Sequence, residues 1–309
     1  LVGFSPIYPI LLIGMAVVSI VSSMWHLPAN AALSHHFPQR RGSALSLHGI
    51  GGSVGDVLGP LLTGFLLATL SWRGILSAYA IAPLFLAFLV LWAFRDIGKT
   101  GDSVPTQDFR AQIRRTQLLL KNSTLWIINL VAGIRGMAFV AFITFLPLYM
   151  DEVLQLSPQS RGFHFGLLIF LGVISTPVLG YLSDRVGRKP VLIPSMLALC
   201  VLSALLALYG EGAMLTLLIA LVGLFLYGDQ PILTAAALDI AGGNVATTTL
   251  GVLSFSRLVL SATAPPLVGL LYQTWGIEAA FYCISTLFAL AAVILLRVPL
   301  KLFVETKVP

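Results

Sequence analysis

The sequence has 309 residues, of which 58% are hydrophobic and 10% are charged. Because a typical soluble domain is about 25% charged, this composition excludes an ordinary soluble protein and predicts a membrane protein with several spans. The formal net charge of +6 comes mostly from bases in the loops between apolar runs. It therefore indicates membrane topology and contacts with anionic lipid, and no nucleic-acid partner is expected.

Nine apolar stretches are long enough to cross a bilayer, which takes about 20 residues in a helix. We expect these spans at 7–33, 42–69, 74–94, 125–150, 162–182, 190–209, 213–237, 247–272 and 278–297. Fourteen bases fall in the loops at one face of the membrane and two at the other, so the base-rich face is predicted to be cytoplasmic. The predicted fold class is all-α, a polytopic membrane protein with nine transmembrane helices.

The longest loop, 95–124, is polar and separates three spans from six. It is expected to be a cytoplasmic linker between two helical bundles, with a short helix on the membrane surface at Asp108–Lys121. The expected domains are 1–94, the linker 95–124, and 125–309. Five pairs of residues recur across the two bundles at spacings of 203 or 205 positions, which indicates an internal repeat. They are Pro28 with Pro231, Trp72 with Trp275, Tyr79 with Tyr282, Pro60 with Pro265, and Gly64 with Gly269.

A charged turn joins the fifth and sixth spans, with the sequence Gly-Tyr-Leu-Ser-Asp-Arg-Val-Gly-Arg-Lys-Pro at 180–190. An ordinary cytoplasmic loop needs bases but not this order of Gly, Asp and Arg. The turn resembles the cytoplasmic gating motif of the major facilitator superfamily of secondary transporters. The matching positions are Gly180, Leu182, Asp184, Arg185, Gly187, Arg188 and Lys189.

This resemblance implies two bundles of six helices that alternate in opening a central site to the two sides of the membrane. Residues 125–297 would be family helices seven to twelve, and the three earlier spans would be helices four to six. The resemblance then implies that the first three family helices are absent from this sequence.

The second span carries Gly51, Gly55 and Gly59 at every fourth residue, a flat ridge on which another helix can pack. Pro60 removes a backbone hydrogen bond and is expected to kink this helix. The stretch resembles the Gly-x-x-x-Gly-Pro-x-x-Gly-Gly signature of proton-coupled exporters within the family. Gly55, Gly59, Pro60 and Gly64 match, whereas Thr63 replaces one glycine. The resemblance implies export, and a ridge used only for packing is the alternative.

Four charged residues are predicted inside the spans, where a charge costs at least about 2.5 kcal/mol and therefore suggests a function. They are Asp56, Arg135, Asp229 and Arg257. Which of these charges pair is open. By the resemblance, the spans of Arg135 and Asp229 line the central cavity, so these two side chains are candidate contacts for the substrate or the coupling ion. A structural ion pair is the alternative. Gln230 is a further candidate, because it follows Asp229 in a Tyr-Gly-Asp-Gln-Pro stretch that predicts a local break in the helix.

Asp56 is the predicted proton carrier, because a carboxyl group inside the membrane can bind and release a proton as the cavity changes sides. The alternative is an ionised Asp56 paired with Arg135 or Arg257. His48 shares a helical face with Asp56, and His26, beside Trp25, is a candidate proton relay or else a buried histidine with satisfied hydrogen bonds. The stretch from Trp25 to His48 resembles bacterial facilitators near the fosmidomycin-resistance proteins.

The expected function is secondary active transport by alternating access, with proton-coupled efflux of a drug or metabolite as the preferred form. A proton-coupled importer of a small organic anion is the alternative, and Arg135 with Arg257 suits it. A membrane-embedded enzyme is disfavoured, because the sequence lacks His-Glu-x-x-His, Gly-x-Ser-x-Gly and phosphate-binding loops. No cofactor or metal is expected, since Cys200 and Cys283 lie inside apolar runs. The expected partners are a small-molecule substrate, protons and membrane lipids, with the protein acting as a monomer in a bacterial inner membrane.

Overall fold

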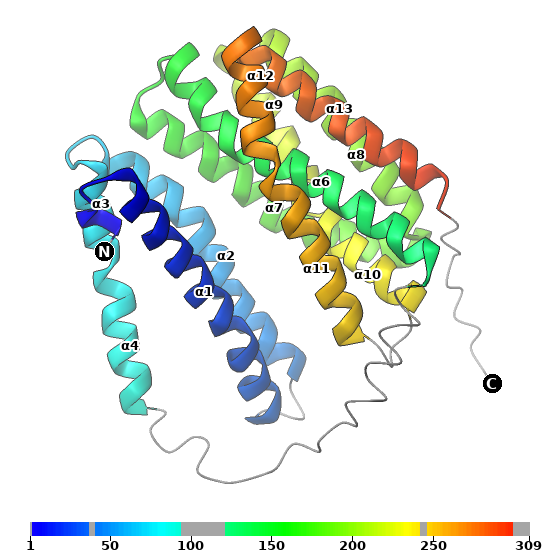
Figure 1. Cartoon of the computed structure of the whole chain (residues 1–309), viewed down its shortest axis with the longest axis horizontal. Helices are drawn as coiled ribbons and strands as arrows, with labels where there is room; N and C mark the ends of the chain where they lie inside the picture. The colour runs from blue at the N-terminus through cyan, green and yellow to red at the C-terminus, as the bar shows by residue number, and fades with distance from the viewer. Residues whose placement is uncertain (1, 37–40, 94–120, 242–245, 299–309) are drawn as a thin grey trace. The chain divides into compact units, whose positions relative to one another are not determined.

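The computed structural model describes residues 2–36, 41–93, 121–241 and 246–298, which are helical almost throughout (Figure 1). After a 3-10 turn, η1 (Val2–Phe4), the first helices are α1 (Tyr8–His36), α2 (Arg41–Leu66), α3 (Trp72–Tyr79) and α4 (Ile81–Ala93). The next are α6 (Ser123–Leu148), a π-helical turn η2 (Tyr149–Val153), α7 (Pro158–Val186) and α8 (Arg188–Tyr209). The last are α9 (Gly212–Leu226), α10 (Asp229–Ala241), α11 (Ala246–Ala262), α12 (Ala264–Trp275) and α13 (Ile277–Leu296).

The helices confirm the all-α, polytopic fold class. Within the described ranges, eight helical stretches are long and apolar enough to cross a membrane, and a shorter apolar stretch, Tyr8–Ser22, lies in α1. Each predicted span coincides with one helix or with two consecutive helices. Residues 95–120 of the predicted linker, which include its predicted surface helix except for Lys121, lie outside the described residues.

Three of the predicted spans are broken into two helices each. The breaks are at Ala80 between α3 and α4, at 227–228 between α9 and α10, and at Thr263 between α11 and α12. The second break was expected from the Tyr-Gly-Asp-Gln-Pro stretch and is confirmed. Its position follows from Pro231, which lacks a backbone N–H and is therefore tolerated in the first turn of a new helix.

The chain forms two compact units. The first contains Leu1–Val104 with Pro158–Gly166, and the second contains Pro105–Ser157 with Leu167–Pro309. The domain boundaries expected from the sequence stay a prediction.

In the first unit, α3 packs against η1. Its N-terminus is capped by the Ser71 hydroxyl, which accepts a hydrogen bond from the backbone N–H of Gly74. In the same unit, α2 packs closely against the first turns of α7. A Cβ atom added to Gly64 would lie 2.9 Å from the Cα of Gly162 and 2.6 Å from the carbonyl oxygen of Pro158. Only glycine permits such contact between backbones.

In the second unit, α13 packs against α8 and α6 around the largest buried side chains. Phe281, Ile284, Phe288 and Leu295 recur at helical spacing on α13 and are fully buried. The ring of Phe281 meets Phe142 of α6 edge to face, with the ring centres 6.1 Å apart. This core fixes α6, which carries the charged site described next.

Candidate substrate and coupling site

Arg135 and Asp229 form a buried ion pair in the second unit. The Nη2 atom of Arg135, on α6, lies 2.5 Å from Oδ1 of Asp229, the first residue of α10. The two side chains are 3% and 0% exposed. Removing two charges from water is costly, and their mutual attraction offsets that cost only when the geometry is favourable.

The break between α9 and α10 supplies the other contacts of Arg135. A helix end leaves backbone carbonyls without partners, and the carbonyl of Leu226, the last residue of α9, accepts a hydrogen bond from Arg135 Nη2. The side-chain oxygen of Gln230 accepts one from Nη1 at 3.5 Å. The guanidinium also lies over the ring of Phe139, 4.9 Å from its centre. The broken helix therefore offers both a carboxylate and a carbonyl to one arginine.

The pair does not use its full hydrogen-bonding capacity. Neither carboxylate oxygen of Asp229 receives a well-aligned hydrogen bond, although the charges are in contact, and Nε of Arg135 donates none. A bidentate arginine–carboxylate pair would satisfy two of these atoms together. The unsatisfied atoms leave the pair able to rearrange or to accept a further polar group.

A second arginine, Arg257 of α11, approaches the pair. Its methylene groups pack over Gly136 of α6, where an added Cβ would lie 2.9 Å from Arg257 Cγ. The side chain is half-buried and close enough to Arg135 for the two charges to repel each other. Among the described residues no acidic side chain pairs with Arg257. The cluster thus contains two positive charges and one negative charge.

The charged turn between α7 and α8 forms its own network. Arg188 contacts the carboxylate of Asp184, and its Nε donates to Oδ2 of Asp239 on α10 at 3.1 Å. Nη1 of Arg188 also donates to the hydroxyl of Ser183 at 2.8 Å. Arg188 therefore links the turn to α10, the helix that begins at the buried Asp229.

The remaining residues of the predicted gating motif support this turn in different ways. Gly187 has φ of 99°, which favours glycine, and allows α8 to start directly after α7. Lys189 donates to the carbonyl of Leu296 at the end of α13, at 2.7 Å. Arg185 lies over the ring of Tyr181. A Cβ at Gly180 would meet no described atom within 4 Å.

The candidate residues of the first unit are not gathered into a comparable cluster. Asp56 is exposed and His48 is half-buried, both on α2. A Cβ on Gly51, Gly55 or Gly59 would meet no described atom within 4 Å, whereas Gly64 is in tight contact. The helix runs through Pro60. The expected kink and the proton-carrier role of Asp56 stay predictions.

Two further candidates cannot be placed. Trp25 and His26 belong to α1, but their side chains lie outside the described part of the chain. In the described ranges, no three or more His, Cys, Asp or Glu side chains gather in a way that could hold a metal ion.

Sequence reasoning missed several partners of the charged residues. The Leu226 carbonyl has no side-chain signature, and Asp239 lies far along the chain from the turn that it joins. Phe139 is four residues after Arg135, so helical spacing alone could have placed the two side chains on one face.

The comparison with known families agrees with this architecture. The model of the Major Facilitator Superfamily matches residues 1–228 and, in a second match, residues 130–307. The chain belongs to the Major Facilitator Superfamily. It is accordingly a multi-pass membrane protein of a transporter family, and two matches of one model to overlapping stretches agree with the internal repeat. The closer resemblance to the fosmidomycin-resistance proteins stays a prediction.

Individual members of the superfamily are similar to the chain at low identity. The glycerol-3-phosphate transporter of Bacillus subtilis is 22% identical over 292 residues, which cover 87% of this chain and 66% of that protein. The multidrug resistance protein MdtG of Yersinia enterocolitica is 30% identical over 162 residues, or 51% of this chain and 39% of that protein. The efflux pump PmrA of Streptococcus pneumoniae is 28% identical over 163 residues, or 52% of this chain and 40% of that protein. The chain thus spans about two thirds of the length of the first of these relatives.

Proposed function

We propose that the complete protein is a secondary active transporter that carries a small organic anion across the cell membrane together with a proton. The observation that carries this proposal is the charge balance of the buried cluster in the second unit. Arg135 and Arg257 face a single acid, Asp229, so the cluster has an excess positive charge. An anion such as a phosphate ester or a carboxylate would neutralise that excess.

The ion pair couples binding of the anion to binding of the proton. When Asp229 binds a proton, it loses its charge, and the positive charge of Arg135 becomes available to an anion. When an anion binds to Arg135, the carboxylate of Asp229 loses its counter-ion and binds a proton more readily. Each ligand therefore favours the other, and this coupling is reciprocal by thermodynamic necessity. A site with this property favours movement of the anion and the proton in the same direction.

Other features agree with this proposal. The broken span at 227–228 places a helix end beside Arg135, and transporters commonly use discontinuous helices to bind substrates and ions. The Bacillus subtilis relative is named as a transporter of glycerol-3-phosphate, which is an anion.

The proposed partners are the substrate, protons and membrane lipids. The transporter is proposed to act as a monomer in a bacterial inner membrane.

A second candidate function is proton-coupled efflux. The observation that favours it is the exporter-like pattern Gly55, Gly59, Pro60 and Gly64, of which Gly64 makes a backbone contact with Gly162. Two relatives that match about half of the chain are named as multidrug resistance proteins. In this candidate, Asp56 carries the proton and the substrate moves outward.

Transport into inverted and right-side-out membrane vesicles tests the two candidates against each other. The complete protein would be given a pH gradient and labelled glycerol-3-phosphate, simple carboxylates and cationic dyes, with and without a protonophore. Asp229→Asn, Arg135→Gln and Asp56→Asn would be compared at equal expression.

The anion proposal expects saturable anion movement along the proton gradient that stops with the protonophore or with Arg135→Gln. Asp229→Asn, which imitates the protonated acid, is expected to keep anion exchange but lose dependence on the gradient. Asp56→Asn is expected to behave like the wild type. Dye movement against the proton gradient that depends on Asp56 would overturn the anion proposal in favour of efflux.

A further inference from the structure

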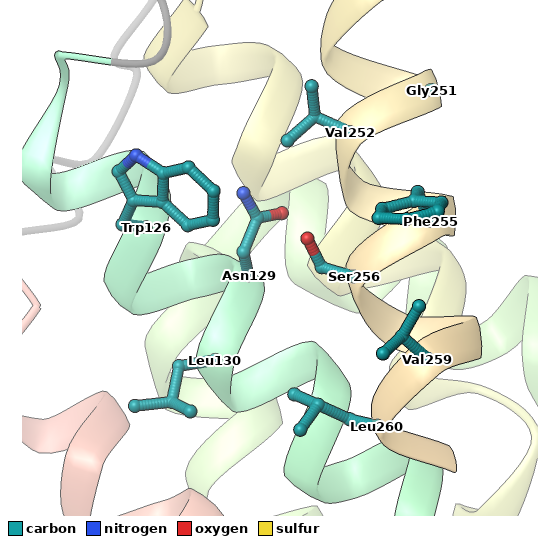
Figure 2. Close-up of a pocket in the computed structure, with 9 residues that line it drawn as sticks. All are labelled: Trp126, Asn129, Leu130, Gly251, Val252, Phe255, Ser256, Val259 and Leu260. Carbon is teal, nitrogen blue, oxygen red and sulfur yellow. The ribbon is translucent and has the colours of Figure 1, made fainter. Parts of the chain in front are cut away.

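A cavity of about 590 Å³ lies between α6 and α11 in the second unit and is open to the surface, where Phe255 is 70% exposed (Figure 2). Trp126, Asn129 and Leu130 line it from α6, and Phe255, Ser256 and Val259 line it from α11. Its size falls within the range of pockets that hold small molecules, about 300–1,000 Å³.

The packing of the two helices explains why the cavity exists. Farther along α6, the glycines at 133 and 136 let α11 approach closely, and an added Cβ on Gly133 would lie 2.2 Å from Leu260 Cδ1. One turn earlier, α6 carries the larger side chains of Asn129 and Leu130. On the opposite wall, Gly251 has no side chain to fill the space. The helices therefore touch at the glycines and leave an opening nearer their N-terminal ends.

Asn129 is the feature that points to a ligand. Its side chain is 2% exposed, yet its Oδ1 atom has no hydrogen-bond partner. Figure 2 shows the amide of Asn129 and the hydroxyl of Ser256 turned toward each other across the opening. Buried polar atoms in folded proteins nearly always have partners, because an unpaired one loses its hydrogen bonds with water without replacement. A bound molecule with an N–H or O–H group would supply the missing donor.

The other residues that line the cavity determine which class of ligand can bind. Trp126 and Phe255 provide aromatic surfaces, and the aliphatic residues complete an apolar lining without a charged side chain among the lining residues. A lipid acyl chain would fill this space but has no donor for Asn129. An organic anion would place its charge against apolar side chains, which is unfavourable.

We propose that this cavity binds a small, uncharged aromatic molecule that donates one hydrogen bond to Oδ1 of Asn129. The aromatic body packs against Trp126 and Phe255. Arg135, Asp229 and Arg257 are not among the lining residues, so the proposed ligand is not held by the residues of the proposed anion site.

Two probes that differ in the hydrogen-bond donor, which one methyl group replaces, test this proposal. 4-Hydroxybiphenyl has a phenolic O–H, whereas 4-methoxybiphenyl has the same apolar body without a donor. Equilibrium dialysis of each labelled probe against the complete protein in lipid nanodiscs, with empty nanodiscs subtracted, measures binding free of partition into lipid. The wild type is expected to bind the hydroxyl probe saturably and roughly tenfold more tightly than the methoxy probe.

Two variants and their controls locate the site. Asn129→Leu is expected to remove the roughly tenfold preference for the hydroxyl probe, and Val259→Trp, which fills the cavity, is expected to abolish saturable binding of both probes. Ser203→Ala is the control for Asn129, because Ser203 also has a buried oxygen without a partner but does not line the cavity. Val201→Trp is the control for Val259, because Val201 is similarly exposed on α8. Both controls are expected to bind like the wild type.

Two results of the binding experiments would overturn the proposal. Equal affinity of the wild type for the two probes would overturn the proposal and identify an apolar groove filled by lipid or by another helix. This comparison needs no variant, so it holds even if Asn129→Leu fails to fold. Binding that survives Val259→Trp would also overturn the proposal, by placing the probe elsewhere.

Discussion

The two units of the chain contain helices of similar apolar character but bury them to different degrees. In the first unit, 6% of an apolar 18-residue window is buried in each of the spans His48–Leu66 and Trp72–Trp92. In the second unit, 61% of such a window is buried in the span Ser123–Val153. Hydropathy selects segments that enter the membrane, but it does not drive helices together there, because lipid tails are as apolar as the side chains. Packing then depends on small residues and on polar partners.

Glycines and charges show this difference most clearly. The second unit uses its glycines as contact points, since Gly133, Gly136 and Gly223 all lie against neighbouring helices. In the first unit, a Cβ added to Gly51, Gly55 or Gly59 would meet no described atom within 4 Å. Asp229 is buried in an ion pair, whereas Asp56 is exposed. Substitutions of matched residues in the two units therefore test whether the second unit is packed more tightly than the first.

The largest expected effect comes from breaking the buried pair. Arg135→Met leaves the charge of Asp229 buried and unpaired, which we expect to lower the free energy of unfolding by about 3–5 kcal/mol. The double variant Arg135→Met with Asp229→Leu is expected to recover most of that loss. Unfolding of the complete chain in lipid bicelles by denaturant measures both variants. A single variant as stable as the wild type would show that the pair is not buried.

A smaller loss is expected from the core of the second unit. Phe288→Ala removes a fully buried ring on α13 and is expected to cost about 3 kcal/mol in the same measurement. Phe88→Ala removes a ring that is 70% exposed on α4, and we expect little change. Equal losses for the two variants would break the comparison, because they would mean that α4 is packed as tightly as α13.

Glycine substitutions give the third effect. Gly223→Ala would place a Cβ 2.5 Å from the carbonyl oxygen of Leu168, so α9 and α7 must separate at a cost of about 1–3 kcal/mol. Gly55→Ala meets nothing within 4 Å in the described structure and is expected to be neutral or slightly stabilising, because alanine favours helices. If Gly55→Ala is as destabilising as Gly223→Ala, the ridge on α2 is packed in the complete protein.

The smallest effect is expected at the charged turn. Arg188 bridges Asp184 and Asp239 near the surface, so Arg188→Ala is expected to lower the free energy of unfolding by at most about 1 kcal/mol. Because salt screens exposed charges, the difference from the wild type should shrink as the salt concentration rises. A loss that is independent of salt would instead indicate packing by the arginine side chain.

Much of the fold followed from the sequence, because the length and apolarity of the spans determine membrane helices. The break at 227–228 followed from Gly228 and Pro231. The break at Ala80 was not predicted, although Pro83 is the third residue of α4 just as Pro231 is the third residue of α10. The resemblance at 180–190 identified the family, which the family model confirms.

The site was only partly predictable. Each charge inside a span was identified, but its partner depends on how the helices pack, which periodicity does not give. The sequence therefore left open which acid pairs with Arg135, and the structure pairs Arg135 with Asp229. Asn129 was missed because one polar residue in an apolar span is common. Its importance appears only when its oxygen is buried without a partner.

Proton uptake during anion binding shows whether Arg135 and Asp229 couple the anion to a proton. The complete protein would be mixed with glycerol-3-phosphate in weakly buffered solution, at a pH at which the anion itself does not titrate, and the pH change would be recorded. We predict uptake of about one proton per anion bound by the wild type and none by Asp229→Asn, which keeps anion binding. Anion binding without proton uptake in the wild type, or unchanged uptake in Asp229→Asn, would contradict the coupling of Arg135 and Asp229.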